Sequence, residues 1–297
     1  MQRLFSALLV AGMAAIPAAA QDRIKGVASF SILGDMVRQV TGDLAEVTTI
    51  VGPAADAHVY TPNAADAKEV TNAEMIFVNG LGFETWSQTL IETSGTKARV
   101  FVAPEGITPL KVDGEIDPHA WNSLTNGMKY VANIAERMAE ADPENAATYK
   151  ANAVAYTAKL KELHNSARDQ LKGLSADQRT VLTAHDAFGY LEAAYGLTFL
   201  APVGIGTESE PSARDLAKLI DHLKEVGAGA LFVENITSPS LVQQIARETG
   251  IQIGGRLFSD ALSQRGGAAT SYEKRFEHNL GPLMRALNQQ SHLATSE

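Results

Sequence analysis

The chain has 297 residues, 34 acidic and 25 basic side chains, a formal net charge of −9, and no cysteine. This length can bury a large core and allows one or two domains. Without cysteine we expect no disulfide, no thiolate metal ligand and no lipid anchor on an N-terminal cysteine. The acidic balance makes nucleic acid an unfavourable partner, so we expect no nucleic-acid binding.

The first twenty residues have the pattern of a secretory signal peptide. Arg3 supplies the positive end, Leu4 to Ile16 form the apolar stretch, and three alanines precede a cleavage site before Gln21. The apolar stretch is shorter than the roughly 20 residues that a membrane span needs. We therefore expect residues 1–20 to be removed on export, which leaves a freely soluble chain of net charge −10 because Arg3 is lost.

The next 121 residues, 21–141, read as an N-terminal α/β lobe. Short apolar runs alternate there with helical patterns, which is typical of βαβ units and a mostly parallel sheet. The expected strands are Ile24 to Ser29, Val47 to Val51, Met75 to Asn79 and Arg99 to Val102, and the expected helices are Ile32 to Thr41, Ala64 to Thr71 and Glu84 to Thr93.

Residues 142–173 read as one long connecting helix. It begins at Asp142-Pro143-Glu144, with proline in the first turn, and contains no internal breaker before Gly173. Such a helix would be about 45 Å long at 1.5 Å per residue. The pattern predicts a rigid connection between two lobes, unlike a flexible Gly/Ser-rich linker.

Residues 174–297 repeat the alternation and predict a C-terminal α/β lobe. Its polar tail, from Gln289 to Glu297, we expect to be frayed. The expected strands are Thr180 to Ala184, Thr198 to Ala201, Ala230 to Val233 and Gln252 to Leu257, and the expected helices are Ala187 to Tyr195, Ala213 to Val226, Leu241 to Thr249 and Ser271 to Asn288.

Four residues form a candidate metal site: His58, His119, His185 and Asp260. Each follows a predicted strand or lies in a turn rich in Gly, Pro or Asp. In open α/β sheets the carboxyl ends of the strands are where ligands bind. The residues are 61, 66 and 75 positions apart, so only the folded two-lobed chain could bring them together.

The remaining candidates have plainer interpretations. Asp260 taken alone could be a helix N-cap. Glu208 and Glu210 fit a solvated loop over the cleft better than a ligand pair. Glu234, at the end of a strand, could support a ligand from behind. The other four histidines fit helix faces or the tail and are not expected to bind metal: His164, His222, His278 and His292.

The motifs around the four candidates carry a family resemblance. The segment around His58, DPHAW at His119, AHDAFGYL at His185 and FSDAL at Asp260, together with the long connector, resemble the solute-binding proteins of zinc and manganese ABC importers, the ZnuA, TroA and AztC relatives. The likeness covers essentially the whole mature chain. It implies that His58 and His119 belong to the N-terminal lobe, that His185 and Asp260 belong to the C-terminal lobe, and that a metal sits between them.

Two departures from relatives bear on the choice of metal. Zinc members often carry a histidine-rich loop before the DPHAW motif, but the segment from Glu105 to Glu115 has no histidine. Manganese members commonly have glutamate where this chain has His185. Three imidazoles and one carboxylate suit Zn²⁺, whereas Mn²⁺ prefers more oxygen. The sequence therefore favours Zn²⁺ and leaves Mn²⁺ as the alternative.

The resemblance implies a monomeric periplasmic receptor, not an enzyme. It would capture Zn²⁺ and deliver it to an ABC permease in the inner membrane, with a periplasmic zinc chaperone as an optional donor. One rival interpretation is a zinc-dependent hydrolase in which three histidines hold the metal and Asp260 acts as base. Another is an adhesin or metal chaperone that works without a transporter.

Overall fold

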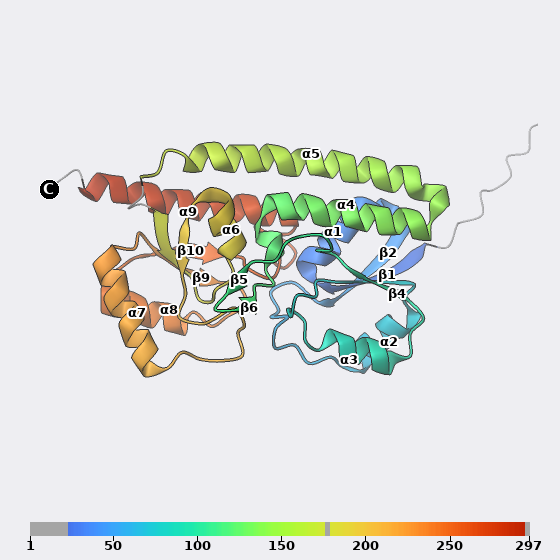
Figure 1. Cartoon of the computed structure of the whole chain (residues 1–297), viewed down its shortest axis with the longest axis horizontal. Coiled ribbons are helices and arrows are strands. Elements are labelled where there is room, and N and C mark those ends of the chain that lie inside the picture. The colour runs from blue at the N-terminus through green and yellow to red at the C-terminus, as the bar shows by residue number, and fades with distance from the viewer. Residues whose placement is uncertain (1–22, 176–178, 295–297) are drawn as a thin grey trace, which may run out of the picture.

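Two α/β lobes lie side by side beneath a long helix (Figure 1). This computed structural model describes residues 23–175 and 179–294, so the predicted signal peptide lies outside the described residues. The predicted fold class is confirmed: each lobe holds a four-stranded parallel sheet, and one helix runs along both. Within the described residues, no helix is long and apolar enough to cross a membrane.

The N-terminal sheet has the strand order β2-β1-β3-β4 and is parallel throughout. Its central strand β1 is buried over its last five residues. Helices α1 and α4 lie on one side of the sheet and α2 and α3 on the other (Figure 1). The elements are β1 (Ile24–Phe30), α1 (Ser31–Thr41), β2 (Ala45–Val51), α2 (Ala64–Asn72), β3 (Met75–Val78), α3 (Ser87–Ser94), β4 (Arg99–Val102) and α4 (Leu124–Ala141).

The C-terminal sheet has the order β10-β9-β7-β8 and is also parallel. A second, smaller apolar cluster packs beneath helices α7 and α8 at the outer side of this lobe. The elements are β7 (Thr180–Leu182), α6 (Gly189–Tyr195), β8 (Thr198–Leu200), α7 (Ala213–Val226), β9 (Leu231–Glu234), α8 (Ser240–Thr249), β10 (Ile253–Leu257) and α9 (Tyr272–Ala294).

Three features differ from the sequence predictions. Helix α4 and a small antiparallel hairpin, β5 (Lys111–Val112) with β6 (Glu115–Ile116), were not predicted. Helix α9 continues to Ala294, so the expected fraying from Gln289 onward is wrong for most of that segment. A glycine inside α4, Gly127, weakens the helical signal. It is needed there because a Cβ atom would collide with the ring of Tyr272.

The predicted connector is present as α5 (Ala146–Leu171), which begins after a short 3₁₀ turn at Pro143–Asn145 capped by Asp142. Its 26 residues span about 39 Å at 1.5 Å per residue. It packs against α4 and α1 of one lobe and against α9 and α6 of the other. Because both ends are held by packed helices, α5 acts as a stiff brace across the two lobes.

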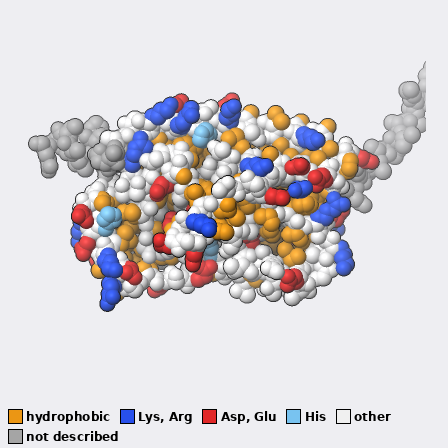
Figure 2. All heavy atoms as spheres, in the orientation of Figure 1, with side chains coloured by type: hydrophobic (Ala, Val, Ile, Leu, Met, Phe, Trp, Pro, Cys, Tyr) orange, Lys and Arg blue, Asp and Glu red, His pale blue; other side chains and the backbone are white. Residues whose placement is uncertain are grey.

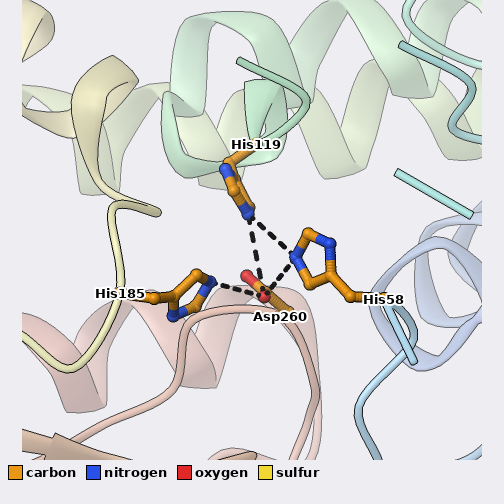
Figure 3. Close-up of side chains that lie close together, drawn as sticks. All are labelled: His58, His119, His185 and Asp260. Carbon is orange, nitrogen blue, oxygen red and sulfur yellow. Dashed lines mark hydrogen bonds and ion pairs between the residues drawn. The ribbon is translucent and has the colours of Figure 1, made fainter. Parts of the chain in front are cut away.

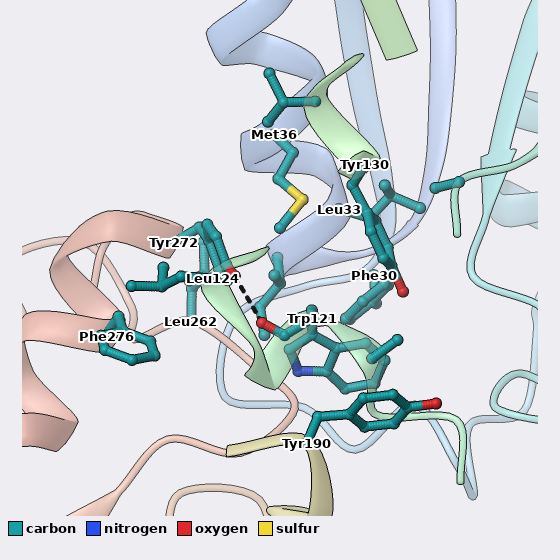
Figure 4. Packing of buried hydrophobic residues seen from close by; sticks show 14 of the residues in the cluster. Phe30, Leu33, Met36, Trp121, Leu124, Tyr130, Tyr190, Leu262, Tyr272 and Phe276 are labelled. Carbon is teal, nitrogen blue, oxygen red and sulfur yellow. Dashed lines mark hydrogen bonds between the residues drawn. The ribbon is translucent and has the colours of Figure 1, made fainter. Parts of the chain in front are cut away.

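One apolar core runs through both lobes. The cluster joins side chains of both sheets, and Trp121 lies near its centre with no exposed surface (Figure 4). The Trp121 indole N–H donates to the carbonyl of Ser259 at 3.0 Å, and the Tyr272 hydroxyl donates to the carbonyl of Trp121 at 2.6 Å. The face drawn in Figure 2 carries charged side chains of both signs, in contrast to this apolar core. Because the core is shared, the lobes are joined by a buried apolar interface.

This construction predicts little change of overall shape when a ligand binds. Wide hinge bending would bend α5 and expose the shared core, so adaptation should be confined to the loops 56–62 and 204–211. X-ray scattering of the metal-free and metal-loaded protein should give nearly equal radii of gyration, while amide exchange slows in those two loops. A closure of many ångströms would contradict the rigid brace.

Candidate metal centre

Four buried side chains converge between the lobes (Figure 3). One potential ligand atom from each of His58, His119, His185 and Asp260 lies within 4.8 Å of the other three. The exposed fractions are 5% for His58, 1% for Asp260, and zero for the other two histidines. The structure thus brings together the four residues that the sequence analysis selected; we call them the four-residue site.

Both lobes contribute two members, each from a loop near the carboxyl end of its sheet. His58 lies in the loop after β2, and His119 precedes the 3₁₀ turn Ala120–Asn122 that leads into α4. His185 follows β7, and Asp260 follows β10. These ends of the two parallel sheets face the interface between the lobes, which is where an α/β fold places a ligand.

The Asp260 carboxylate lies at the centre of the four-residue site. Its Oδ2 atom is 3.0 Å from His185 Nε2, 3.3 Å from His58 Nε2 and 3.7 Å from His119 Nε2. His58 Nε2 and His119 Nε2 are 3.3 Å apart. All three imidazoles therefore direct the same ring nitrogen, Nε2, toward one point, as ligands of a single ion do.

A buried carboxylate fixes the orientation of His119. Asp117 Oδ1 lies 2.8 Å from His119 Nδ1 and also accepts the His119 backbone N–H at 2.9 Å. A proton held on Nδ1 leaves the lone pair of Nε2 free for a metal. Gly189 makes room for this carboxylate, because a Cβ atom there would lie 2.8 Å from Asp117 Oδ2. Asp117 is the first residue of the DPHAW motif, and its role in holding His119 becomes evident only in the folded structure.

Glu234 holds His185 in the same way in the other lobe. Its Oε1 atom accepts the backbone N–H groups of Ala184 and His185 at 2.7 and 2.9 Å. Its Oε2 atom lies 2.7 Å from His185 Nδ1. The two atoms are close enough for an ion pair but are not aligned for a hydrogen bond. The predicted contact of Glu234 behind a candidate ligand is present in the structure.

His58 lies on the side of the four-residue site that borders a groove, and it is held through its backbone. Its backbone N–H donates to Asp56 Oδ1 at 2.9 Å, and the second oxygen of Asp56 accepts from the Thr207 hydroxyl of the other lobe at 2.7 Å. A groove of about 600 Å³ runs past His58 between the lobes. Its wall includes Glu208, which is exposed, as expected for a solvated loop; Glu210 is exposed as well.

The charges within the four-residue site shift two pKa values in opposite directions. Burial alone would lower the pKa of His185, but the carboxylates of Glu234 and Asp260 outweigh it and raise that pKa well above its usual value. Burial alone would raise the pKa of Asp260, but His119 and His185 outweigh it and hold that pKa well below its usual range. The site therefore needs positive charge, which a proton or a metal cation can provide.

The other histidines that the structure describes with side chains lie away from this site. His164 Nδ1 contacts the Tyr195 hydroxyl at 2.9 Å, and His278 Nε2 contacts the carbonyl of Arg256 at 3.2 Å. His222 is half exposed on α7. His292 lies in the last turns of α9, beyond the residues whose side chains are described.

Comparisons with known proteins agree with this architecture. The chain is 34% identical over 269 residues to the manganese-binding lipoprotein MntA of Halalkalibacterium halodurans, with 90% of each chain covered. It is 31% identical over 280 residues to the iron ABC transporter substrate-binding lipoprotein MtsA of Streptococcus pyogenes serotype M1, with 91% of this chain and 90% of that one covered.

A solved structure has the same two-lobed fold. The periplasmic zinc binding protein TroA from Treponema pallidum superimposes with a TM-score of 0.86 at 28% identity, covering 90% of this chain and 99% of its own. The family described as zinc-uptake complex component A periplasmic, ZnuA, matches residues 27–286. With its two parallel sheets, its brace helix and its match across nearly the whole chain, this protein belongs to the ZnuA family.

Proposed function

We propose that this protein captures Zn²⁺ in the periplasm and delivers it to an ABC-type permease in the inner membrane. The observation that carries the proposal is the four-residue site, in which three Nε2 atoms and one carboxylate oxygen converge in a buried pocket shared by both lobes. Zn²⁺ is the cargo in this proposal, not a resident cofactor.

The donor set suits zinc. Structural zinc sites are four-coordinate, with nitrogen, oxygen or sulfur ligands. The nitrogen and oxygen ligands lie about 2.0 to 2.2 Å from the zinc ion. Distances of 3.0 to 3.7 Å between the imidazole nitrogens and Asp260 Oδ2 are what neighbouring ligands of one small tetrahedral ion require. The Nδ1 contacts of His119 and His185 with buried carboxylates hold both rings in the tautomer that binds metal through Nε2.

The printed names of the relatives span manganese, iron and zinc, so family membership leaves the metal open. The preference for zinc rests on the imidazole of His185. A glutamate there would give a set of two nitrogens and two carboxylates, which suits the harder Mn²⁺. Three imidazoles shift the preference toward zinc, and Mn²⁺ remains the second candidate cargo.

A receptor fits the four-residue site better than a hydrolase does. Catalytic zinc keeps a coordination position open for water or substrate, whereas all four positions here are supplied by side chains. The hydrolase alternative makes Asp260 a base, but its Oδ2 atom points at the same centre as the three imidazoles. Asp260 is therefore assigned as the fourth ligand.

The proposed location and partners follow from the same role. The signal-peptide pattern of residues 1–20 and the periplasmic family description support a location outside the cytoplasm. There it would act as a monomer, taking zinc as the free ion or from a periplasmic chaperone and delivering it to the permease.

The first test counts ligands. His119→Ala should weaken zinc binding at least about tenfold, because it removes one of four bonds in a closed shell. His222→Ala is the matched control, since that ring is half exposed on α7. Purified protein, freed of metal, would be titrated with zinc against a chelator of known affinity. Equal affinity for both variants would remove the four-residue site as the zinc site.

The second test addresses Glu234. In Glu234→Gln the amide oxygen can still accept the backbone bonds, but an N–H₂ group can face His185 Nδ1 and favour the tautomer with its proton on Nε2. We expect a loss of about 10- to 100-fold in zinc affinity. The control is Glu192→Gln, because Glu192 accepts the Phe199 N–H at 2.9 Å in the same lobe and is not part of the four-residue site. Similar losses in both variants would mean a general effect on that lobe.

The third test is pH dependence. The raised pKa of His185 means that the metal-free site keeps its proton at a higher pH than a free imidazole, and zinc must displace that proton. Affinity should therefore fall as the pH drops, beginning above the ordinary histidine pKa of about 6.5, with protons released when zinc binds at neutral pH. Calorimetry in buffers of different ionisation enthalpy would count these protons, and a flat profile would contradict an imidazole-based site.

The fourth test concerns the choice of metal. His185→Glu should lose more zinc affinity than manganese affinity and so narrow the preference, without necessarily inverting it, since zinc stands above manganese in intrinsic affinity. Competition between the two ions on the native chain and the variant measures this ratio. Equal losses for both ions would show that His185 does not set selectivity.

A further inference from the structure

A fully buried arginine on α9 contacts the backbone beside one candidate ligand and a side chain close to another. The Nη2 atom of Arg275 donates to the Ser259 carbonyl at 2.6 Å, and Ser259 immediately precedes Asp260. The same nitrogen donates to the Oδ1 atom of Asn122, three residues after His119. Arg275 therefore ties the Asp260 loop of one lobe to the His119 loop of the other.

Asn122 extends the connection to a third ligand. Its side-chain N–H₂ donates at 2.7 Å to the carbonyl of Ala187, two residues after His185. Asn122 is itself only 2% exposed, so this amide has both ends engaged inside the protein. The path Arg275, Asn122, Ala187 links the loops of His119, His185 and Asp260 through two side chains.

Burying the charged side chain of Arg275 costs folding free energy, which indicates that this residue has a role beyond packing. Burial lowers the pKa of Arg275 to about 10, so the guanidinium is still charged at neutral pH. The ion pairs found among the described residues do not include it, and its Nη2 contacts are a carbonyl and an amide oxygen. A buried charge without a paired carboxylate is unfavourable for stability. Its planar fork is suited to holding two acceptors at fixed positions.

We propose that Arg275 and Asn122 are positioning residues that hold three of the four ligand loops in register for metal. The inference rests on the proposed function and deepens it, since the site draws on both lobes and these two side chains set how closely the lobes present their ligands. The fourth ligand, His58, is positioned separately through Asp56 and Thr207.

The test uses Arg275→Met, which keeps an unbranched aliphatic chain and loses the donors, and Asn122→Ala, which removes the buried amide. Each should lower zinc affinity about 10- to 100-fold. The double variant should lose no more than the worse single variant, because both interrupt one path. If Arg275→Met does not fold, Arg275→Lys and Asn122→Ala carry the test. Arg275→Lys should then retain part of the zinc affinity of the native protein.

A second measurement separates positioning from general destabilisation. Bound Co²⁺ absorbs visible light according to its coordination geometry, so the Co²⁺ spectrum of both variants should change in band position or intensity. The control is Leu160→Ala, because Leu160 is fully buried in the core on α5 and is not part of the three loops. At an equal loss of melting temperature, it should leave the spectrum and the zinc affinity unchanged.

The outcomes are distinct. Native protein that binds neither zinc nor cobalt would overturn the proposed function. Native protein that binds both, with Arg275 and Asn122 variants of unchanged affinity and spectrum, would overturn only the positioning role. Losses in the double variant that multiply, or a matching loss in Leu160→Ala, would also overturn it, because they indicate independent or nonspecific effects.

Discussion

The attraction between one buried carboxylate and three buried imidazoles is the constraint on which this structure depends. Asp260 lies 1% exposed, with three Nε2 atoms within 3.7 Å of its Oδ2. Such a buried carboxylate is tolerable only if positive charge is present beside it. Two further carboxylates, Asp117 and Glu234, orient the rings from behind. The shared core and the α5 brace then keep the two halves of the site together.

Much of the architecture was predictable because it follows from local patterns. Alternating apolar runs indicated both parallel sheets, and the unbroken stretch after Pro143 indicated the brace helix. The four candidate ligands could be selected because each follows a predicted strand or lies in a turn rich in Gly, Pro or Asp. Helix α4 was missed because Gly127 interrupts its pattern, and that glycine is explained only by the ring of Tyr272, 145 positions away. Arg275 reads as an ordinary charge in an amphipathic helix; only the tertiary fold reveals its burial.

The arrangement separates two properties that a metal receptor must combine. Overall shape is set by α5, which lies away from the four-residue site, and by the apolar interface around Trp121, whose ring packs against His119. Local access is set by loops, since His58 borders the groove. Its loop contacts the other lobe through the Asp56 to Thr207 hydrogen bond and through the Ala54 backbone N–H, which donates to the Leu262 carbonyl at 2.9 Å. Exchange of cargo can therefore occur by loop movement while the surface offered to a partner keeps its form.

The wide spacing of the four residues along the chain also links cargo to folding. The residues of the four-residue site are 61, 66 and 75 positions apart in the sequence. They can surround an ion only after both lobes and their interface have formed. A chain that crosses a membrane unfolded would thus cross without metal, and it would acquire affinity only as a consequence of completing its fold. Any ion bound afterwards stabilises the folded state by mass action. Scarcity of metal would then leave the receptor easier to unfold and to degrade, so the abundance of the protein could itself follow the supply of its cargo.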